Sequence, residues 1–153
     1  MKNQNPDASA SPTVVVSATP DNTITDPAIY AQEIFALTNV EREKAGLEQL
    51  IWDDCAAAQA TERATVLLAS AELTHAPLAP VAQACSYGIN AENLVDAAVT
   101  PEHVLASWLK SPGHAANILD PTLSLLGVGC VTNGEEEGHP KMLCSQIFMG
   151  VLE

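Results

Sequence analysis

Four cysteines constrain this chain more than any other feature of its sequence. They stand at positions 55, 85, 130 and 144, and no two of them form a Cys-x-x-Cys pair. This spacing argues against a zinc ribbon or a thioredoxin-type redox site. An even number of separated cysteines favours a pair of disulfides and therefore an oxidising compartment. The alternative is a cytosolic protein in which the thiols are reduced and buried.

The C-terminal part of the chain has the pattern of a β-hairpin. Residues 125–131 and 142–151 are rich in β-branched and other apolar residues, whereas the segment between them, 132–140, is polar and contains glycine. Two β-rich runs joined in this way predict antiparallel strands connected by a long acidic loop. We expect His139, which lies in this loop, to be solvated.

The hairpin predicts how the cysteines pair, for which three arrangements are possible. Cys130 and Cys144 lie on its two arms, equally far from residue 137 near the loop centre. Their Cα atoms are then expected to be about 4.4–6.8 Å apart, as a disulfide requires, with both side chains facing the core. That leaves Cys55 to pair with Cys85, which closes a loop of about thirty residues and stabilises the fold by about 3–4 kcal/mol in the chain-entropy model.

The remainder of the chain carries helix signals. Asp26 and Pro27 fit the N-cap and first turn of a helix that ends at Gly46. Apolar residues recur there every three or four positions and predict its buried face. These residues are Tyr30, Ile34, Leu37 and Val40.

Capping residues open three further helices, at positions 53–54, 100–101 and 111–112. The first of these is expected to run to about residue 71, and the last to end at residues 120–121. Proline and glycine predict an irregular segment over 73–96. Four helices followed by a hairpin indicate an α+β fold, with the helices packed on a small antiparallel sheet.

The N-terminal segment differs from the rest. Residues 1–25 are rich in Ser, Thr, Pro and Asn and lack any helical or strand periodicity, so they are predicted to be a disordered tether. Residues 26–153 form a single domain's length of chain. No stretch approaches the roughly 20 apolar residues of a membrane span, so we expect no transmembrane segment.

The charge of the chain excludes some partners. Lys and Arg number 6 and Asp and Glu number 19, which gives a formal net charge of −13. Such a surface repels phosphate backbones and anionic membranes, so nucleic acid is excluded as a partner. The charge otherwise indicates a soluble protein, and we expect a monomer.

Three residues combine into a candidate site. His114 is the third residue of the helix capped by Ser111, where the positive end of the helix dipole keeps an imidazole neutral. Glu92 is expected in a turn among core residues, and a buried carboxylate needs partners, for which His75 and His114 are available. Two imidazoles and a carboxylate are the ligands of an open zinc site. The alternative is a hydrogen-bonded cluster that orders the loops.

Several segments, in order, resemble bacterial members of the CAP superfamily, which comprises the cysteine-rich secretory, antigen 5 and pathogenesis-related 1 proteins. The resemblance covers roughly residues 30–151. The similar segments are TNVEREKAGL at 38–47, LIWD at 50–53, TH at 74–75, AENL at 91–94, WLKSPGH at 108–114, NIL at 117–119, GVG at 127–129 and SQIFMG at 145–150.

This resemblance implies an α–β–α sandwich with a solvent-open cavity. In animal and plant members two histidines and two glutamates line the cavity and can hold zinc. His75 and Glu92 match two of these positions, whereas Ser111 and Leu143 stand where the other two would fall. The bacterial pattern suggests His114 as a spatial substitute, so any zinc binding is expected to be weak. The other residues expected to line the cavity are Asn93, Ser111 and Gln146.

The resemblance also implies function, because the family is mostly extracellular and binds ligands. We expect a secreted or surface-tethered, non-enzymatic binding module for a small apolar, lipid-like ligand. One alternative is a hydrolase in which His75, Glu92 and His114 hold a metal that activates water. A metal-free version would use Ser111 with His114, although the Ser111 hydroxyl is expected to be engaged as an N-cap. The other alternative is a scaffold that binds another protein or a cell-wall polymer.

Overall fold

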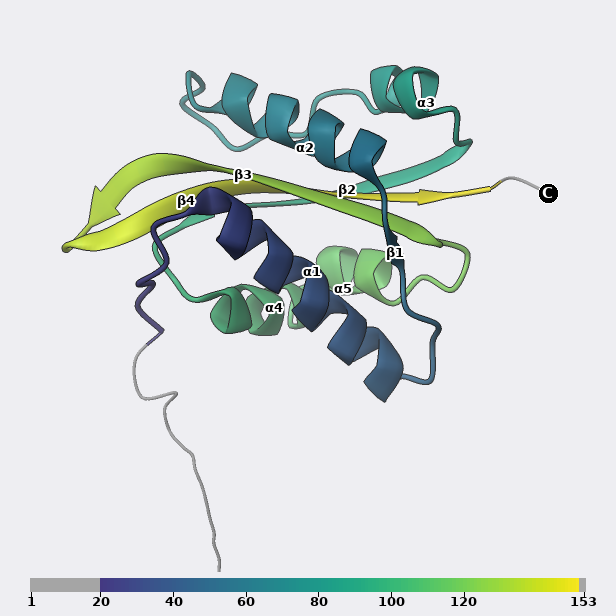
Figure 1. Cartoon of the computed structure of the whole chain (residues 1–153), viewed down its shortest axis with the longest axis horizontal. Helices are drawn as coiled ribbons and strands as arrows, with labels where there is room; N and C mark the ends of the chain where they lie inside the picture. Colours follow the sequence, from purple (N-terminus) through teal and green to yellow (C-terminus); the bar gives the residue numbers. More distant parts are fainter. Residues whose placement is uncertain (1–19, 152–153) are drawn as a thin grey trace, which may run out of the picture.

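A computed structural model describes residues 20–151 of the chain, so residues 1–19 of the tether predicted over 1–25 lie outside the described residues. One sheet separates two layers of helices (Figure 1). The helices are α1 (Pro27–Lys44), α2 (Asp54–Leu67), α3 (Ala79–Cys85), α4 (Pro101–Leu109) and α5 (Pro112–Ile118). The strands are β1 (Ile51–Trp52), β2 (Ile89–Ala97), β3 (Leu125–Glu136) and β4 (His139–Gly150).

The sheet has the strand order β1-β3-β4-β2, in which β4 pairs antiparallel with both β3 and β2 and the short β1 pairs parallel with β3. Helices α2 and α3 cover one face, and α1, α4 and α5 cover the other (Figure 1). The predicted α+β class and α–β–α sandwich are confirmed, with one helix more than expected. None of the described helices is long and apolar enough to cross a membrane.

Helix α1 forms as its caps predict, but its buried face differs from the prediction. The Asp26 side chain accepts a hydrogen bond from the backbone N–H of Ala28, and Gly46 ends the helix with a φ of +78°. Val40 is 44% exposed, so its predicted burial is wrong. The buried face instead includes polar side chains that find partners there: Thr38, Asn39 and Arg42. The Arg42 guanidinium donates to backbone carbonyls around the end of α5 and so ties α1 to that helix.

The irregular segment predicted over 73–96 is wrong, because α3 and most of β2 lie within it. Pro80 sits in the first turn of α3, where a missing N–H costs no hydrogen bond. Strand β2 carries polar residues at its centre and pairs with β4 from Ile89 opposite Gly150 to Ala97 opposite Met142. Tertiary contacts rather than local propensity hold these polar residues in a strand.

The predicted hairpin forms, but the long loop over 132–140 is wrong. Strands β3 and β4 extend through most of that segment, and Glu136 pairs with His139 beside a tight turn. Glu137 and Gly138 make this turn with φ values of +51° and +84°. His139 is partly exposed, with its side chain 34% accessible, and its Nε2 lies 3.4 Å from Asp21 Oδ2.

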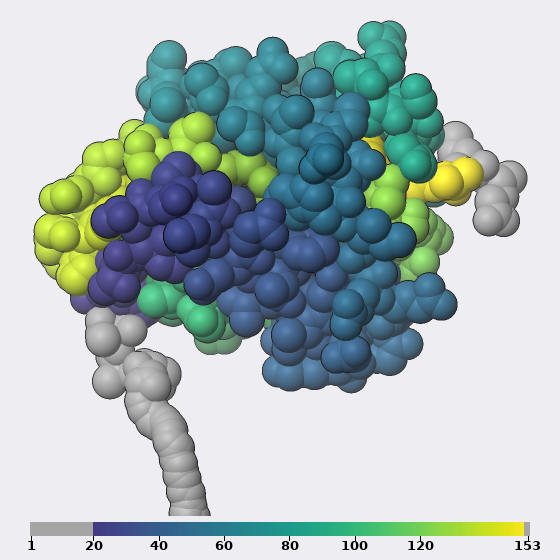
Figure 2. Space-filling view, in the orientation of Figure 1, coloured from purple at the N-terminus to yellow at the C-terminus, as the bar shows by residue number. Residues whose placement is uncertain are grey.

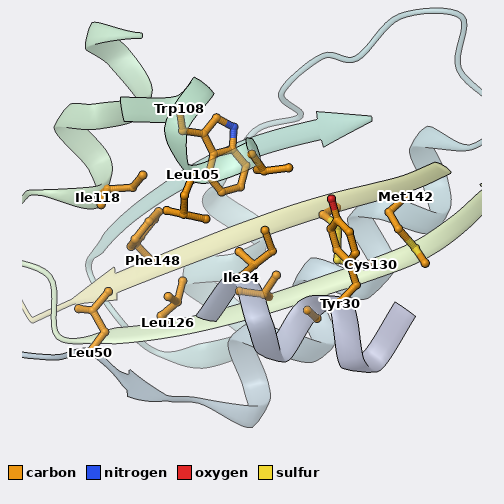
Figure 3. Close-up of a cluster of buried hydrophobic side chains, with 14 of the residues drawn as sticks. Tyr30, Ile34, Leu50, Leu105, Trp108, Ile118, Leu126, Cys130, Met142 and Phe148 are labelled. Carbon is orange, nitrogen blue, oxygen red and sulfur yellow. A yellow bond between two sulfur atoms is a disulfide. The ribbon is translucent and has the colours of Figure 1, made fainter. Parts of the chain in front are cut away.

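Both predicted disulfides are present. The Cα atoms of Cys55 and Cys85 are 5.7 Å apart, and the bond joins α2 to α3. Cys130 and Cys144 are direct partners across β3 and β4, with Cα atoms 4.1 Å apart, slightly closer than expected. They face the larger of two cores, between the sheet and the α1, α4 and α5 layer (Figure 3).

The smaller core lies between the sheet and α2 with α3. Helix α2 approaches β3 closely there, as Gly127 shows: a Cβ at this position would lie 2.1 Å from the Ala57 nitrogen.

The domain also begins earlier than predicted. Asn22, assigned to the tether, is fully buried, and its side chain donates to the carbonyls of Ile24 and Pro140.

Candidate functional site

Glu92 is the centre of the candidate site. It lies in β2 rather than in the expected turn, and its side chain is 2% exposed. Its Oε2 accepts hydrogen bonds from Arg63 Nε at 2.7 Å and from Ser145 Oγ at 2.6 Å. Its Oε1 accepts from Arg63 Nη2 at 2.9 Å and lies 2.9 Å from His75 Nδ1. The buried carboxylate therefore has partners on both oxygens, as such a group requires.

The environment of Glu92 keeps it ionised. Burial raises the pKa of Glu92, but hydrogen bonds from Arg63, Ser145 and His75, together with the charge of Arg63, outweigh burial and lower the pKa below its usual value. A buried carboxylate held in this state is a poor proton acceptor, because its charge is already neutralised by the guanidinium.

Arg63 was not predicted from the sequence, although it is the strongest partner of Glu92. It projects from α2, beside the buried stripe of Ala56, Ala60 and Ala64. Besides the carboxylate, it donates to the backbone carbonyls of Ala76 and Pro77. One guanidinium thus joins β2 to the segment between α2 and α3. A lone arginine in an alanine-rich helix was the only sequence signal that pointed to it.

His75 lies in that segment and has one free ring nitrogen. Its Nδ1 faces Glu92, its side chain is 55% exposed, and its Nε2 has no hydrogen-bond partner among the described residues. The predicted contact between His75 and Glu92 is present. His75 is therefore oriented by the buried carboxylate while its other nitrogen remains accessible to solvent or to a ligand.

His114 makes contacts that differ from those of His75. Its Nδ1 is 2.8 Å from Ser111 Oγ, and its ring stacks on Trp108 with centroids 6.3 Å apart. Burial lowers the pKa of His114, and the charge of His75 lowers it further. No hydrogen bond between His114 and Glu92 is present. Ser111 is the N-cap of α5 as predicted, but its hydroxyl makes no capping bond and contacts His114 instead.

Asn93 and Gln146 are fully buried on the opposite face of the sheet from Glu92. Asn93 Nδ2 donates to Gln146 Oε1 at 3.0 Å, and Gln146 Nε2 donates to Thr38 Oγ1 at 2.8 Å. Asn117 of α5 donates to Asn93 Oδ1 at 2.9 Å. This network holds α1 and α5 against the sheet, and neither residue lines the hollow described next.

A hollow of about 340 Å³ opens beside Glu92, between α2 and the segment that leads to α3. We call it the Glu92 hollow. Its size falls within the range of about 300–1,000 Å³ typical of small-molecule sites. The residues that line it are Gln59, Glu62, Arg63, Val66, Leu67, Ser70, Thr74, Ala76, Pro80 and Glu92. His75 itself lies between Thr74 and Ala76 in the chain, and both of these residues line the hollow.

A second hollow of about 340 Å³ lies between α1 and α2 over β3 and includes Ala28 and Ala57. Figure 2 views the molecule from the side on which these two helices lie. The residues around this hollow are mostly small and apolar, and it contains none of the candidate site residues.

The donor set does not fit a zinc ion. Both oxygens of Glu92 already bind Arg63, which supplies the positive charge that a metal would bring. Leu143, where the resemblance places a histidine, is a buried apolar residue. Among the described residues, the one trio of ligand atoms within 4.8 Å is that of Asp53, Cys55 and Cys85, whose sulfurs form a disulfide.

Comparison with protein families places most of the chain in one of them. The model described as the cysteine-rich secretory protein family, CAP, matches residues 35–148. The uncharacterized protein YkwD of Bacillus subtilis is 33% identical over 112 residues, which cover 69% of this chain and 44% of YkwD. The chain thus spans less than half the length of that relative.

Solved structures share the fold. An extracellular protein containing an SCP domain from Bacillus anthracis has a TM-score of 0.68 and 24% identity, over 81% of this chain and 41% of the other. A cysteine-rich secretory protein from Staphylococcus aureus has a TM-score of 0.67 and 19% identity, over 84% and 40%. An outer surface protein from Borrelia burgdorferi has a TM-score of 0.69 and 18% identity, over 85% and 98%.

Proposed function

The chain belongs to the cysteine-rich secretory protein (CAP) family, and we propose that it is an extracellular or cell-surface module that binds a small apolar ligand in the Glu92 hollow. The location is supported by two disulfides and by structural relatives that are described as extracellular or outer-surface proteins. Disulfides persist outside the reducing cytosol, so the cysteine chemistry and the relatives agree.

One observation carries the proposal for binding rather than catalysis. The carboxylate that would serve as a base is neutralised by Arg63 and fully hydrogen-bonded, and it is 2% exposed. A general base must be free to accept a proton from the reacting group. Beside it lies a preformed hollow with apolar walls from Val66, Leu67 and Pro80, which is the usual character of a small-ligand site.

Titration with 1-octanol tests this proposal, with backbone amide shifts followed by NMR. We expect saturable shifts at the residues of the Glu92 hollow. Replacing Ala76 by Phe fills the hollow and should abolish them, whereas Ala28→Phe fills the hollow between α1 and α2 and should leave them intact. Shifts that persist in the Ala76→Phe protein, or that follow Ala28→Phe instead, would rule out this site.

A second function is supported by a separate contact. Ser111 Oγ lies 2.8 Å from His114 Nδ1, and the lowered pKa of His114 keeps the imidazole neutral, as a base for a serine nucleophile must be. Among the residues that the structure describes, no carboxylate is hydrogen-bonded to the His114 ring, and Glu92 contacts His75 instead. A fluorophosphonate probe that labels the wild type but not Ser111→Ala would establish a hydrolase. If the wild-type protein is not labelled, the hydrolase is ruled out and only the binding function remains.

A further inference from the structure

The charges that line the Glu92 hollow do not cancel. Three of its residues are charged, namely Glu62, Arg63 and Glu92. Arg63 and Glu92 neutralise one another through two hydrogen bonds. Glu62 is exposed and has no ion-pair partner among the described residues. The lining of the hollow therefore carries one net negative charge, which comes from Glu62.

The hollow offers little to hold an anion. Arg63 is its only cationic lining residue, and four hydrogen bonds use its N–H groups. A guanidinium has five N–H donors, so at most one remains for a ligand. A carboxylate or phosphate head would also meet Glu62 and the field of a chain whose net charge is −13.

Exposed apolar side chains lie on the hollow's lining and in the segment that follows α2. Val66, which lines it, is 69% exposed, and Leu68 and Leu73 in the following segment are 42% and 43% exposed. Burying such side chains against a hydrocarbon would stabilise a complex by roughly 25 cal/mol for each Å² removed from water. An apolar chain can therefore lie along this end of α2 with its polar head near Glu62.

From these charges we infer that the ligand of the Glu92 hollow is a cationic amphiphile, an apolar chain that carries an ammonium group paired with Glu62. This inference rests on the proposed binding function and adds the chemical class of the ligand to it. The ammonium remains solvated at the mouth, so the ion pair selects among ligands while the apolar contacts supply most of the affinity.

Three probes that share one tail separate the head-group preference from binding itself. Octylammonium, 1-octanol and octanoate are titrated into the full chain at pH 7.5 and low ionic strength, and NMR shifts at the hollow report binding. We expect octylammonium to bind roughly fivefold more tightly than octanoate, with octanol between them, because one pair of exposed charges contributes up to about 1 kcal/mol. Added salt should narrow the difference.

Matched variants assign the preference to one carboxylate. Glu62→Gln should reduce the ratio of the octylammonium and octanoate affinities to about twofold, where only the field of the whole chain remains. Glu33→Gln removes the same charge from an exposed position on α1 and should leave the ratio unchanged. Circular dichroism of each variant confirms that the fold is intact.

The outcomes separate this inference from the proposed function. If octanol binds in the hollow but octanoate binds as tightly as octylammonium, the cationic preference is wrong and the binding function stands. If Glu33→Gln and Glu62→Gln lower the ratio equally, the preference belongs to the net charge and not to this site. If none of the three probes shifts the residues of the hollow, the proposed function fails, and the inference fails with it.

Discussion

The guanidinium of Arg63 contacts both carboxylate oxygens of Glu92, with Nε 2.7 Å from Oε2 and Nη2 2.9 Å from Oε1. Both side chains are largely buried, with exposures of 12% and 2%. Because neither can return to bulk water in the folded state, each depends on the other for compensation of its charge.

Arg63→Met should lower the free energy of unfolding by about 3–5 kcal/mol, because it leaves a buried carboxylate unpaired. Urea denaturation at pH 7 measures this. The comparison variant is Lys44→Met, which breaks an ion pair with Glu41 whose lysine is 68% exposed. We expect that change to cost less than about 1 kcal/mol. Equal costs for the two variants would contradict a special role for the buried pair.

The Arg63→Met variant should also reverse the way in which the ionisation of Glu92 makes stability depend on pH. In the wild type the pKa of Glu92 is lowered, so its contribution to stability is present above the ordinary carboxyl range and is lost as the pH falls through the folded-state pKa. Without Arg63, burial should raise that pKa instead. The stability of Arg63→Met should then increase relative to wild type as the pH falls from 7 to 5. If the difference in unfolding free energy between the variant and the wild type stays constant from pH 7 to 5, Arg63 does not set the pKa of Glu92.

Gly129→Ala should disrupt the packing of α2 on β3. A Cβ at this position would lie 2.2 Å from the Thr61 nitrogen, so backbone must move. We expect a loss of about 1–3 kcal/mol, as is usual for overpacked cores. Gly113→Ala is the control, since a Cβ there meets nothing within 4 Å. In a helical position it should raise stability by up to about 1 kcal/mol. Similar effects at both glycines would refute the close approach.

Replacing Cys55 and Cys85 together by alanine should cost about 3–4 kcal/mol, because their bond, with a sequence separation of 30, restricts the unfolded chain. Cys130 and Cys144 close a shorter loop, with a separation of 14, and the corresponding loss of loop restriction is about 3 kcal/mol. Chemical denaturation with and without reductant checks both. Each double variant has only one disulfide left, so reductant should lower its free energy of unfolding by less than it lowers that of the wild type. If reductant lowers both by the same amount, the disulfide that was removed does not contribute to stability as expected.

His75→Gln should raise the pKa of His114 towards its ordinary value, because it removes the positive charge that adds to the effect of burial. NMR titration of the His114 ring protons measures this. A lowered histidine pKa makes the folded state bind protons less readily than the unfolded state, so stability falls as the pH drops below about 6.5. The variant should show less of that fall. His103→Gln, at an exposed position on α4, should not move the His114 titration.

The sequence signals that succeeded were local. The cap at Asp26, the cap at Thr100 and the symmetry of Cys130 and Cys144 about a turn all depend on residues close together in the chain. Each has a fixed geometric consequence, so its position could be predicted without knowledge of the rest of the molecule.

The predictions that were wrong or missing concern features that depend on residues far apart in the chain. Strand β2 is polar at its centre, and Glu92 is held there by Arg63 and Ser145, which lie 29 and 53 residues away. No local periodicity encodes such partners. The contact of His75 with Glu92 was expected because a buried carboxylate needs partners and the chain has only four histidines that could serve. The role of Arg63 was not predicted, because the side chain of an arginine on a helix is ordinarily exposed to solvent.

The sheet divides the apolar interior into two parts, and each part has its own disulfide. Cys130 and Cys144 belong to the larger core, and Cys85 belongs to the smaller core, against which Cys55 packs. Regions with fewer buried contacts open more often in the native state than the body of a protein does. The α2 and α3 layer is therefore expected to exchange its amide hydrogens first. The wall that α2 contributes to the Glu92 hollow is therefore expected to open more often than the α1, α4 and α5 layer on the opposite face of the sheet, which should keep its amide hydrogens longer.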